Sequence, residues 1–206
     1  MSFRGRCATL FPLLHLSLCG SGLAAWIHTG CALWCLWILG FLYLFPPIAF
    51  QIHQRLWPLQ EGWRRLDTPN YSPWWGSLQM QAVFNAAPVL EALLRIVPGC
   101  YSLWLRLWGS RIGRAVVWSP RVEISDRALV DIGDRVVFGH RVALYGHVVD
   151  RRNGTFFLYA KRIRIGAGAF LGAGSRIGPG AIIGPGVRLP VLTDVRVGEH
   201  KRPDPP

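Results

Sequence analysis

The feature that most constrains this fold is a six-residue repeat of aliphatic side chains between positions 162 and 189. The aliphatic positions are Ile165, Leu171, Ile177, Ile183 and Leu189. Each of the first four is followed directly by glycine, and each has a small or β-branched residue four positions later. A period of six fits neither the 3.6 residues of a helical turn nor the two-residue alternation of a strand. It predicts a solenoid of flat sides, with glycine turning the corners, coils of about eighteen residues and a stacking distance of about 4.8 Å.

The repeat continues upstream with two irregularities. Its earlier inward positions are Ile112, Trp118, Ile124, Ile132, Phe138 and Leu144, with a phase slip of two residues before Ile132. The 21 residues from Leu144 to Ile165 are not a multiple of six, so a segment must leave the regular coil. Turn-forming and charged residues at 150–154 predict a loop there, and such loops commonly carry binding and catalysis. We expect a repeat domain at 109–198 and a disordered polar tail at 199–206.

Two apolar runs without charged side chains precede the repeat, at 7–27 and 31–52. The second has 22 residues, which as a helix span about 33 Å and can cross the hydrocarbon layer. We predict a transmembrane hairpin at 1–55; a cleaved signal peptide with one anchor, or a re-entrant pair, are the alternatives. Arginines flank only the outer ends of the hairpin, so both termini are expected in the cytoplasm.

Residues 56–108 combine tryptophans, prolines and short apolar stretches. Indoles mixed with arginines suit the interface between lipid headgroups and water. We interpret this segment as an interfacial, tryptophan-rich region with short membrane-surface helices broken near Pro98. The alternative is a helical cap on the first coil of the solenoid, and the two can coexist.

Composition narrows the choice of partners. The net charge is +12, the chain is 51% hydrophobic, and it contains ten tryptophans. No nucleic-acid motif accompanies the basic residues, so we expect membrane lipids or a phosphate-bearing ligand as partners, and no nucleic acid. The five cysteines all precede the solenoid and show neither metal-binding spacing nor a disulfide framework, so no metal is expected.

The candidates for chemistry are two histidines of the solenoid, His140 and His147. Counted from the inward residues Phe138 and Leu144, both are predicted to point outward. A mostly neutral imidazole near pH 7 suits a general base. Asp150 is a candidate for orienting the imidazole, and its alternative is a solvated loop residue.

Three runs, GSRIGRAVVWSP, LVDIGDRVVFGHRVALYGH and RIRIGAGAFLGAGSRIGPGAIIG, resemble the hexapeptide-repeat acyltransferases. The resemblance covers about residues 74–190. It is to a membrane-attached branch that includes the acyltransferase-like terminal modules of some peptide synthetases. It implies a mainly β fold, a left-handed parallel β-helix preceded by the hairpin. It also implies transfer of an acetyl or short acyl group from acyl-CoA to a hydroxyl or amine of a membrane-proximal acceptor. Gly146-His147 matches the position of the family's general base, whereas His140 does not.

The same resemblance implies a homotrimer that binds acyl-CoA, expected to be acetyl-CoA, in a groove between neighbouring solenoids. Residues that offer small side chains or positive charge for that groove are Lys161, Arg162, Arg164, Gly172, Gly174, Ser175, Arg176 and Gly178. Because acyl-CoA is cytoplasmic, we expect a multi-pass protein of the bacterial inner (cytoplasmic) membrane whose β-helix domain faces the cytoplasm.

Two other functions compete with acyl transfer. One is a non-catalytic trimeric membrane scaffold. The other is a metalloenzyme resembling γ-carbonic anhydrase, which needs three histidine ligands per metal, whereas the solenoid has two histidines before its tail. Nothing in the sequence identifies the acceptor.

Overall fold

The computed structural model of the protein describes residues 2–202. The chain forms two compact units. The first extends through Leu59 and also contains Thr68–Ala86, and the second contains Gln60–Asp67 and the chain from Ala87 onward. The predicted interfacial segment 56–108 is therefore divided between the two units.

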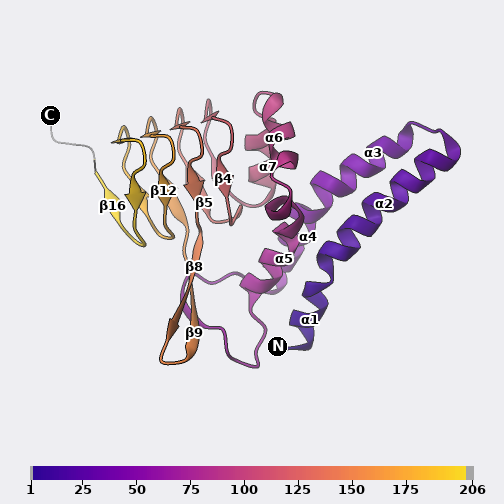
Figure 1. Ribbon diagram of the computed structural model, residues 1–206, viewed down its shortest axis with the longest axis horizontal. Helices are drawn as coiled ribbons and strands as arrows, with labels where there is room; N and C mark the ends of the chain where they lie inside the picture. Colours follow the sequence, from indigo (N-terminus) through magenta and orange to yellow (C-terminus); the bar gives the residue numbers. More distant parts are fainter. Residues whose placement is uncertain (1, 203–206) are drawn as a thin grey trace. The chain divides into compact units, whose positions relative to one another are not determined.

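The first unit is helical. Its elements are α1 (Phe3–Thr9), α2 (Phe11–Thr29), α3 (Leu33–Leu39), the π-helical η1 (Gly40–Leu44), α4 (Phe45–Leu56) and α5 (Pro73–Ala86). A turn at Gly30, with φ of 65°, reverses the chain so that α2 and α3 run side by side (Figure 1). At their contact the Trp37 indole Nε1 donates to the Leu18 carbonyl over 3.1 Å. The predicted helical hairpin is present.

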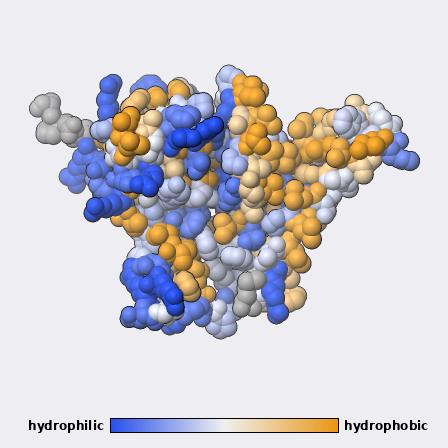
Figure 2. Space-filling model, in the orientation of Figure 1, coloured by the Kyte–Doolittle hydropathy of each residue, from blue (hydrophilic) through white to orange (hydrophobic). Residues whose placement is uncertain are grey.

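The helices of this hairpin are apolar on their outer surface. Phe3–Thr29 and Leu33–Leu56 are both long and apolar enough to cross a membrane, and a signal sequence near the N-terminus meets the same criteria. Leu13, Ile27 and Leu36 are more than 60% exposed, and Figure 2 shows hydrophobic surface along this hairpin. His15, by contrast, is buried near the aromatic rings of Phe11, Phe45 and Phe84.

Pro46 and Pro47 do not end the second apolar helix. They occupy the first turn of α4, where a missing N–H is tolerated. The preceding five residues form η1, so the helix changes its hydrogen-bond register and continues.

The second unit is a solenoid with two helices at its first coil. The helices are α6 (Val89–Ile96) and α7 (Cys100–Leu107). The solenoid strands are β2 (Arg111–Ile112), β3 (Val117–Trp118), β4 (Glu123–Ile124), β5 (Val130–Ile132), β6 (Val137–Phe138), β7 (Ala143–Leu144), β10 (Ile163–Ile165), β11 (Phe170–Leu171), β12 (Arg176–Ile177), β13 (Ile182–Ile183), β14 (Arg188–Leu189), β15 (Asp194–Val195) and β16 (His200–Lys201).

These strands form three parallel sheets, ordered β16-β13-β10-β5-β2, β14-β11-β6-β3 and β15-β12-β7-β4. With β8 and β9 left aside, each solenoid strand therefore pairs with the third solenoid strand after it, as a three-sided parallel β-helix requires (Figure 1). The inward positions align in register: Ile132 pairs with Ile165, Phe138 with Leu171, and Leu144 with Ile177. These six side chains are at most 4% exposed, which confirms the six-residue phase across the irregular segment.

Glycine serves two different purposes at the corners. Left-handed backbone angles occur at the third corner position, at Gly168, Gly174, Gly180 and Gly186. At the first corner position, Gly172 has no such angle, but an added Cβ would lie 2.4 Å from the carbonyl carbon of Pro190 in the next coil. The glycine that directly follows the aliphatic residue thus permits close stacking of coils, whereas the sequence had suggested that it makes the turn.

The segment that leaves the regular coil is a β-hairpin, where the sequence predicted a loop. Its strands are β8 (His147–Arg152) and β9 (Thr155–Ala160), and its turn is at Asn153-Gly154. β9 also pairs with β1 (Gly62–Arg65), which gives an antiparallel sheet ordered β1-β9-β8. The hairpin extends away from the stacked coils (Figure 1).

Two expectations need correction. The chain is not mainly β, because about 40% of it is helical, owing to the N-terminal helical hairpin and the short helices that follow it. The predicted tail also begins too early, because β16 pairs with β13 and extends the solenoid through Lys201. The remainder of that tail, 203–206, lies outside the described residues.

Candidate active site

His147 lies at the corner where the chain leaves the solenoid for the hairpin. Its Nδ1 is 2.6 Å from Oδ2 of Asp126, on the corner one coil earlier. The Asp126 side chain is 2% exposed, whereas the His147 side chain is 22% exposed. Because a carboxylate only accepts hydrogen bonds, Nδ1 is the donor, and in the neutral imidazole the lone pair is then on Nε2. The pair therefore has the geometry of an oriented general base.

Two neighbouring residues hold this pair together. The Ser125 hydroxyl donates to Oδ2 of Asp126 over 2.6 Å and accepts the Gly146 amide over 3.2 Å. A Cβ at Gly146 would lie 2.7 Å from the Cβ of Asp126. Glycine before His147 is thus needed for the carboxylate to approach the imidazole.

Asp126 was missed by the sequence analysis, although a signal for it was present. The phase slip of two residues between Ile124 and Ile132 falls at this corner, which runs from Ser125 to Leu129 between β4 and β5. The larger corner carries both Asp126 and the buried Arg127. The departure from the six-residue period therefore marks the corner whose aspartate contacts His147.

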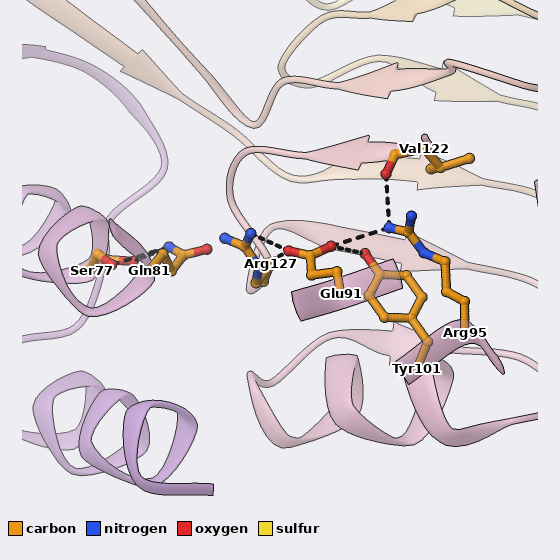
Figure 3. Close-up of polar contacts among 7 residues, drawn as sticks. All are labelled: Ser77, Gln81, Glu91, Arg95, Tyr101, Val122 and Arg127. Atoms are coloured by element: carbon orange, nitrogen blue, oxygen red, sulfur yellow. Dashed lines mark hydrogen bonds and ion pairs between the residues drawn. The ribbon is translucent and has the colours of Figure 1, made fainter. Parts of the chain in front are cut away.

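A buried ion-pair network anchors that corner (Figure 3). The Arg127 guanidinium, 2% exposed, donates from Nε to Oε1 of Glu91 on α6 over 2.8 Å, and Nη2 contacts the same oxygen. Arg95 Nη2 lies 3.2 Å from Oε2 of Glu91 and 2.8 Å from the carbonyl oxygen of Val122. Two elements distant in sequence, α6 and the first coil, are thereby joined next to Asp126.

Tyr101 on α7 completes the network by donating its hydroxyl to Oε2 of Glu91 over 2.6 Å. Burial, and then the negative charge of Glu91, raise the pKa of Tyr101 far above its ordinary value. The phenol therefore stays protonated and remains a donor. The Arg95 guanidinium stacks 4.2 Å from the centre of the Tyr101 ring.

His140 and Asp150 lie apart from the Asp126–His147 pair. His140 is exposed on the corner between β6 and β7, whereas His147 follows β7 at the next corner. The Asp150 carboxylate accepts a hydrogen bond from Nε of Arg152 over 2.7 Å, and this bond lowers the pKa of Asp150. The carboxylate that contacts the imidazole is that of Asp126, not Asp150.

The small residues predicted for the groove have structural reasons of their own. An added Cβ would lie 2.7 Å from the Leu192 side chain at Gly174 and 3.0 Å from the Val197 amide at Gly178. The Ser175 hydroxyl, fully buried, donates to the Pro190 carbonyl and accepts the Thr193 amide.

The four basic residues predicted for the groove differ in whether an ion pair holds them. Arg162 Nη1 donates to Asp131 over 2.9 Å, and Arg176 forms a two-bond pair with Asp194 at 2.7 and 2.5 Å. Arg164 and Lys161 are exposed, and within residues 2–202 neither forms an ion pair. The Lys161 stem lies over Gly180, at the same corner as His147.

Over the described part of the chain, no three histidine, cysteine, aspartate or glutamate side chains are grouped so that they could hold a metal ion.

Of the comparisons with known proteins, the one with solved structures gives matches. No protein-family model matches the sequence, and no curated protein matches it. Solved structures that match include a hexapeptide-repeat-containing acetyltransferase from Vibrio cholerae. It is 15% identical, with a TM-score of 0.32, and the match covers 57% of this chain and 83% of that one. The assignment as a parallel β-helix rests on the strand pairing and register themselves.

Proposed function

We propose that this protein is an acyltransferase that moves an acetyl or short acyl group from acyl-CoA to a hydroxyl or amine, with His147 as the general base. The observation that carries the proposal is the 2.6 Å contact between His147 Nδ1 and the buried Asp126 carboxylate. The buried carboxylate holds one ring nitrogen, so the other nitrogen of this partly exposed imidazole is the one proposed to take the proton of an acceptor.

In the proposed reaction Nε2 of His147 takes the proton of the acceptor hydroxyl or amine as that atom bonds to the acyl carbon. Acyl-CoA supplies the thioester, whose carbon–sulfur bond breaks, and the proton returns from Nε2 to the departing sulfur. Asp126 stabilises the imidazolium that exists between these two transfers. General-base assistance of this kind contributes about 10² to 10⁴ in rate.

Among the residues proposed for acyl-CoA, Lys161 fits best. It is exposed, it lies at the corner that carries His147, and its stem covers Gly180. Arg164 is the second candidate because it too is exposed and without an ion pair among the described residues. Arg162 and Arg176 are neutralised by aspartates, and Gly172, Gly174, Ser175 and Gly178 are explained by coil packing.

We further propose a left-handed β-helix, assembly as a homotrimer, and two membrane crossings by the α2–α3–α4 hairpin of an inner-membrane protein. The two long apolar helices and their exposed aliphatic side chains support the crossings. Trimer and handedness follow from the sequence resemblance to the membrane-attached acyltransferases. Reporter fusions at Gly30 and Pro206 test the topology: the first is expected outside and the second in the cytoplasm.

The function is tested with the full chain in detergent, radiolabelled acetyl-CoA and a membrane extract as the source of acceptor. We expect His147→Ala to keep its acetyl-CoA affinity while transfer falls at least about a hundredfold. His140→Ala, at another corner, is the matched control and should lose much less. Full transfer by His147→Ala would place the base elsewhere. A wild-type protein that binds no acetyl-CoA would favour the alternative, a trimeric membrane scaffold.

A further inference from the structure

The antiparallel sheet β1-β9-β8 carries His147 on one of its two faces. Alternation along β8 places His147, Val149 and Arg151 on the same face. The strand register adds residues from the neighbouring strands to that face. These are Ala160, Leu158 and Phe156 of β9 and Gly62 and Arg64 of β1. We call this set the His147 face.

The His147 face carries exposed apolar side chains and two arginines: Arg151 lies level with Phe156 at the far end, and Arg64 lies level with Val149 and the buried Leu158. Val149 is 44% exposed and Phe156 is 45% exposed. Arg151 lies over the Phe156 ring, 5.6 Å from its centre, and Arg64 is exposed two strands away. Figure 2 shows the hydrophilic end of the hairpin next to hydrophobic surface.

The two faces of the sheet differ in charge. On the opposite face Arg152 is paired with Asp150 at 2.7 Å, and Arg65 is paired with Asp67 at 2.9 Å just beyond β1. The His147 face has no acidic residue within β1, β8 and β9, all of which the structure describes. Arg64 and Arg151 are therefore positive charges that no strand carboxylate on their face offsets.

We propose that the His147 face binds an anionic amphiphile, and that the acceptor is such a molecule. The proposal of an acceptor rests on the proposed function, whereas binding itself does not. The apolar part of the ligand lies along Val149 and Phe156, and its phosphate or carboxylate group reaches Arg151 and Arg64. Arg151 lies four residue steps along the strand from His147, which is about 13 Å.

The orientation of the ligand follows from charge. Asp126 places a carboxylate beside His147, at the base of the face. Lys161 at the same corner is proposed for acyl-CoA, so the cations left for the anionic group of the ligand are Arg151 at the other end and Arg64 level with Val149, where charge-assisted hydrogen bonds are available. The neutral hydroxyl or amine of the ligand is thus left at Nε2, where the proposed reaction needs it.

Binding is tested on the full chain in dodecyl maltoside, with radiolabelled dodecyl phosphate as the probe and inorganic phosphate as the comparison without an alkyl chain. The variant Arg64→Gln/Arg151→Gln removes the charges of the His147 face. Arg65→Gln/Arg152→Gln removes the same charge from the same two strands on the opposite side, so it is a matched control.

We expect saturable binding of dodecyl phosphate that weakens at least tenfold in Arg64→Gln/Arg151→Gln and less than twofold in the control. Inorganic phosphate is expected to bind at least tenfold more weakly than dodecyl phosphate. Equal weakening in both double variants, or no saturable binding by the wild type, would overturn the proposal. If phosphate alone binds as tightly, the site recognises the anion and not an amphiphile, which also contradicts it.

A second measurement separates this proposal from the proposed function. His147→Ala removes the proposed base but keeps both arginines, so it should weaken dodecyl phosphate binding far less than Arg64→Gln/Arg151→Gln does. If acyl transfer is never observed but the two double variants still differ in their affinity for dodecyl phosphate, the binding surface is supported and the enzymatic role is wrong. If transfer occurs and Arg64→Gln/Arg151→Gln leaves the KM for the acceptor unchanged, the role of the face in acceptor binding is wrong.

Discussion

Removal of the charge of Glu91 is expected to be among the most destabilising single changes in the solenoid unit. Its carboxylate contacts Arg127, Arg95 and the Tyr101 hydroxyl, and its side chain is 6% exposed. Glu91→Gln keeps the shape of the side chain but leaves two largely buried guanidinium groups without that carboxylate. Loss of one partner of a buried ion pair costs about 3–5 kcal/mol.

We expect Glu91→Gln to lie at the lower end of that range, because the amide oxygen still accepts a hydrogen bond from Arg127, and Glu91→Leu to lie at the upper end. For a chain of this size, about 3 kcal/mol corresponds to a decrease in Tm of about 6–12 °C. Thermal unfolding in detergent measures it. Hydrogen exchange then locates the change, which should appear at the corner that carries Asp126.

Asp194→Asn is the matched control, since it removes one negative charge from an ion pair with an arginine on the solvent-exposed surface of the same unit. It should leave Tm unchanged within error, because exposed ion pairs contribute little. If Glu91→Gln has the same Tm as the control, and its hydrogen exchange at residues 125–129 equals that of the wild type, the network does not anchor the corner.

Three further changes test the site and the coils. Tyr101→Phe should reduce the loss of folding stability in alkali. Burial raises the pKa of Tyr101 in the native state, so its contribution to wild-type stability is full below the unfolded pKa of about 10 and declines above it. For one proton the decline is at most about 1.4 kcal/mol per pH unit. Identical alkaline slopes from denaturant titrations of the two proteins would refute this. Asp126→Asn should reduce acyl transfer at least about tenfold with acetyl-CoA affinity unchanged, because the amide no longer favours the Nδ1–H tautomer; normal transfer would contradict the paired role. Gly172→Ala should destabilise the solenoid by about 1–3 kcal/mol, because its Cβ meets the Pro190 carbonyl at 2.4 Å; unchanged stability would show that the coils separate easily.

Much of the solenoid could be predicted from the sequence, because in a repeat fold each side is determined by residues close together in the chain. The six-residue phase placed Ile165, Leu171 and Ile177 in the core, and the structure buries all three. The apolar runs likewise predicted the helical hairpin. Wherever the six-residue period is regular, the local sequence pattern is enough to predict which residues point inward.

The candidate site depended on the tertiary structure, because it is built where the period is broken. Asp126 and His147 are 21 residues apart, and only the stacking of one coil on the next brings them to 2.6 Å. Sequence proximity favoured Asp150 instead, but a residue three positions along a strand faces the opposite side of the sheet. The anchoring of this corner by Glu91, 36 positions before Arg127, likewise required α6 to pack against the first coil. Sequence alone determined the repeat, and tertiary packing decided which carboxylate contacts the histidine.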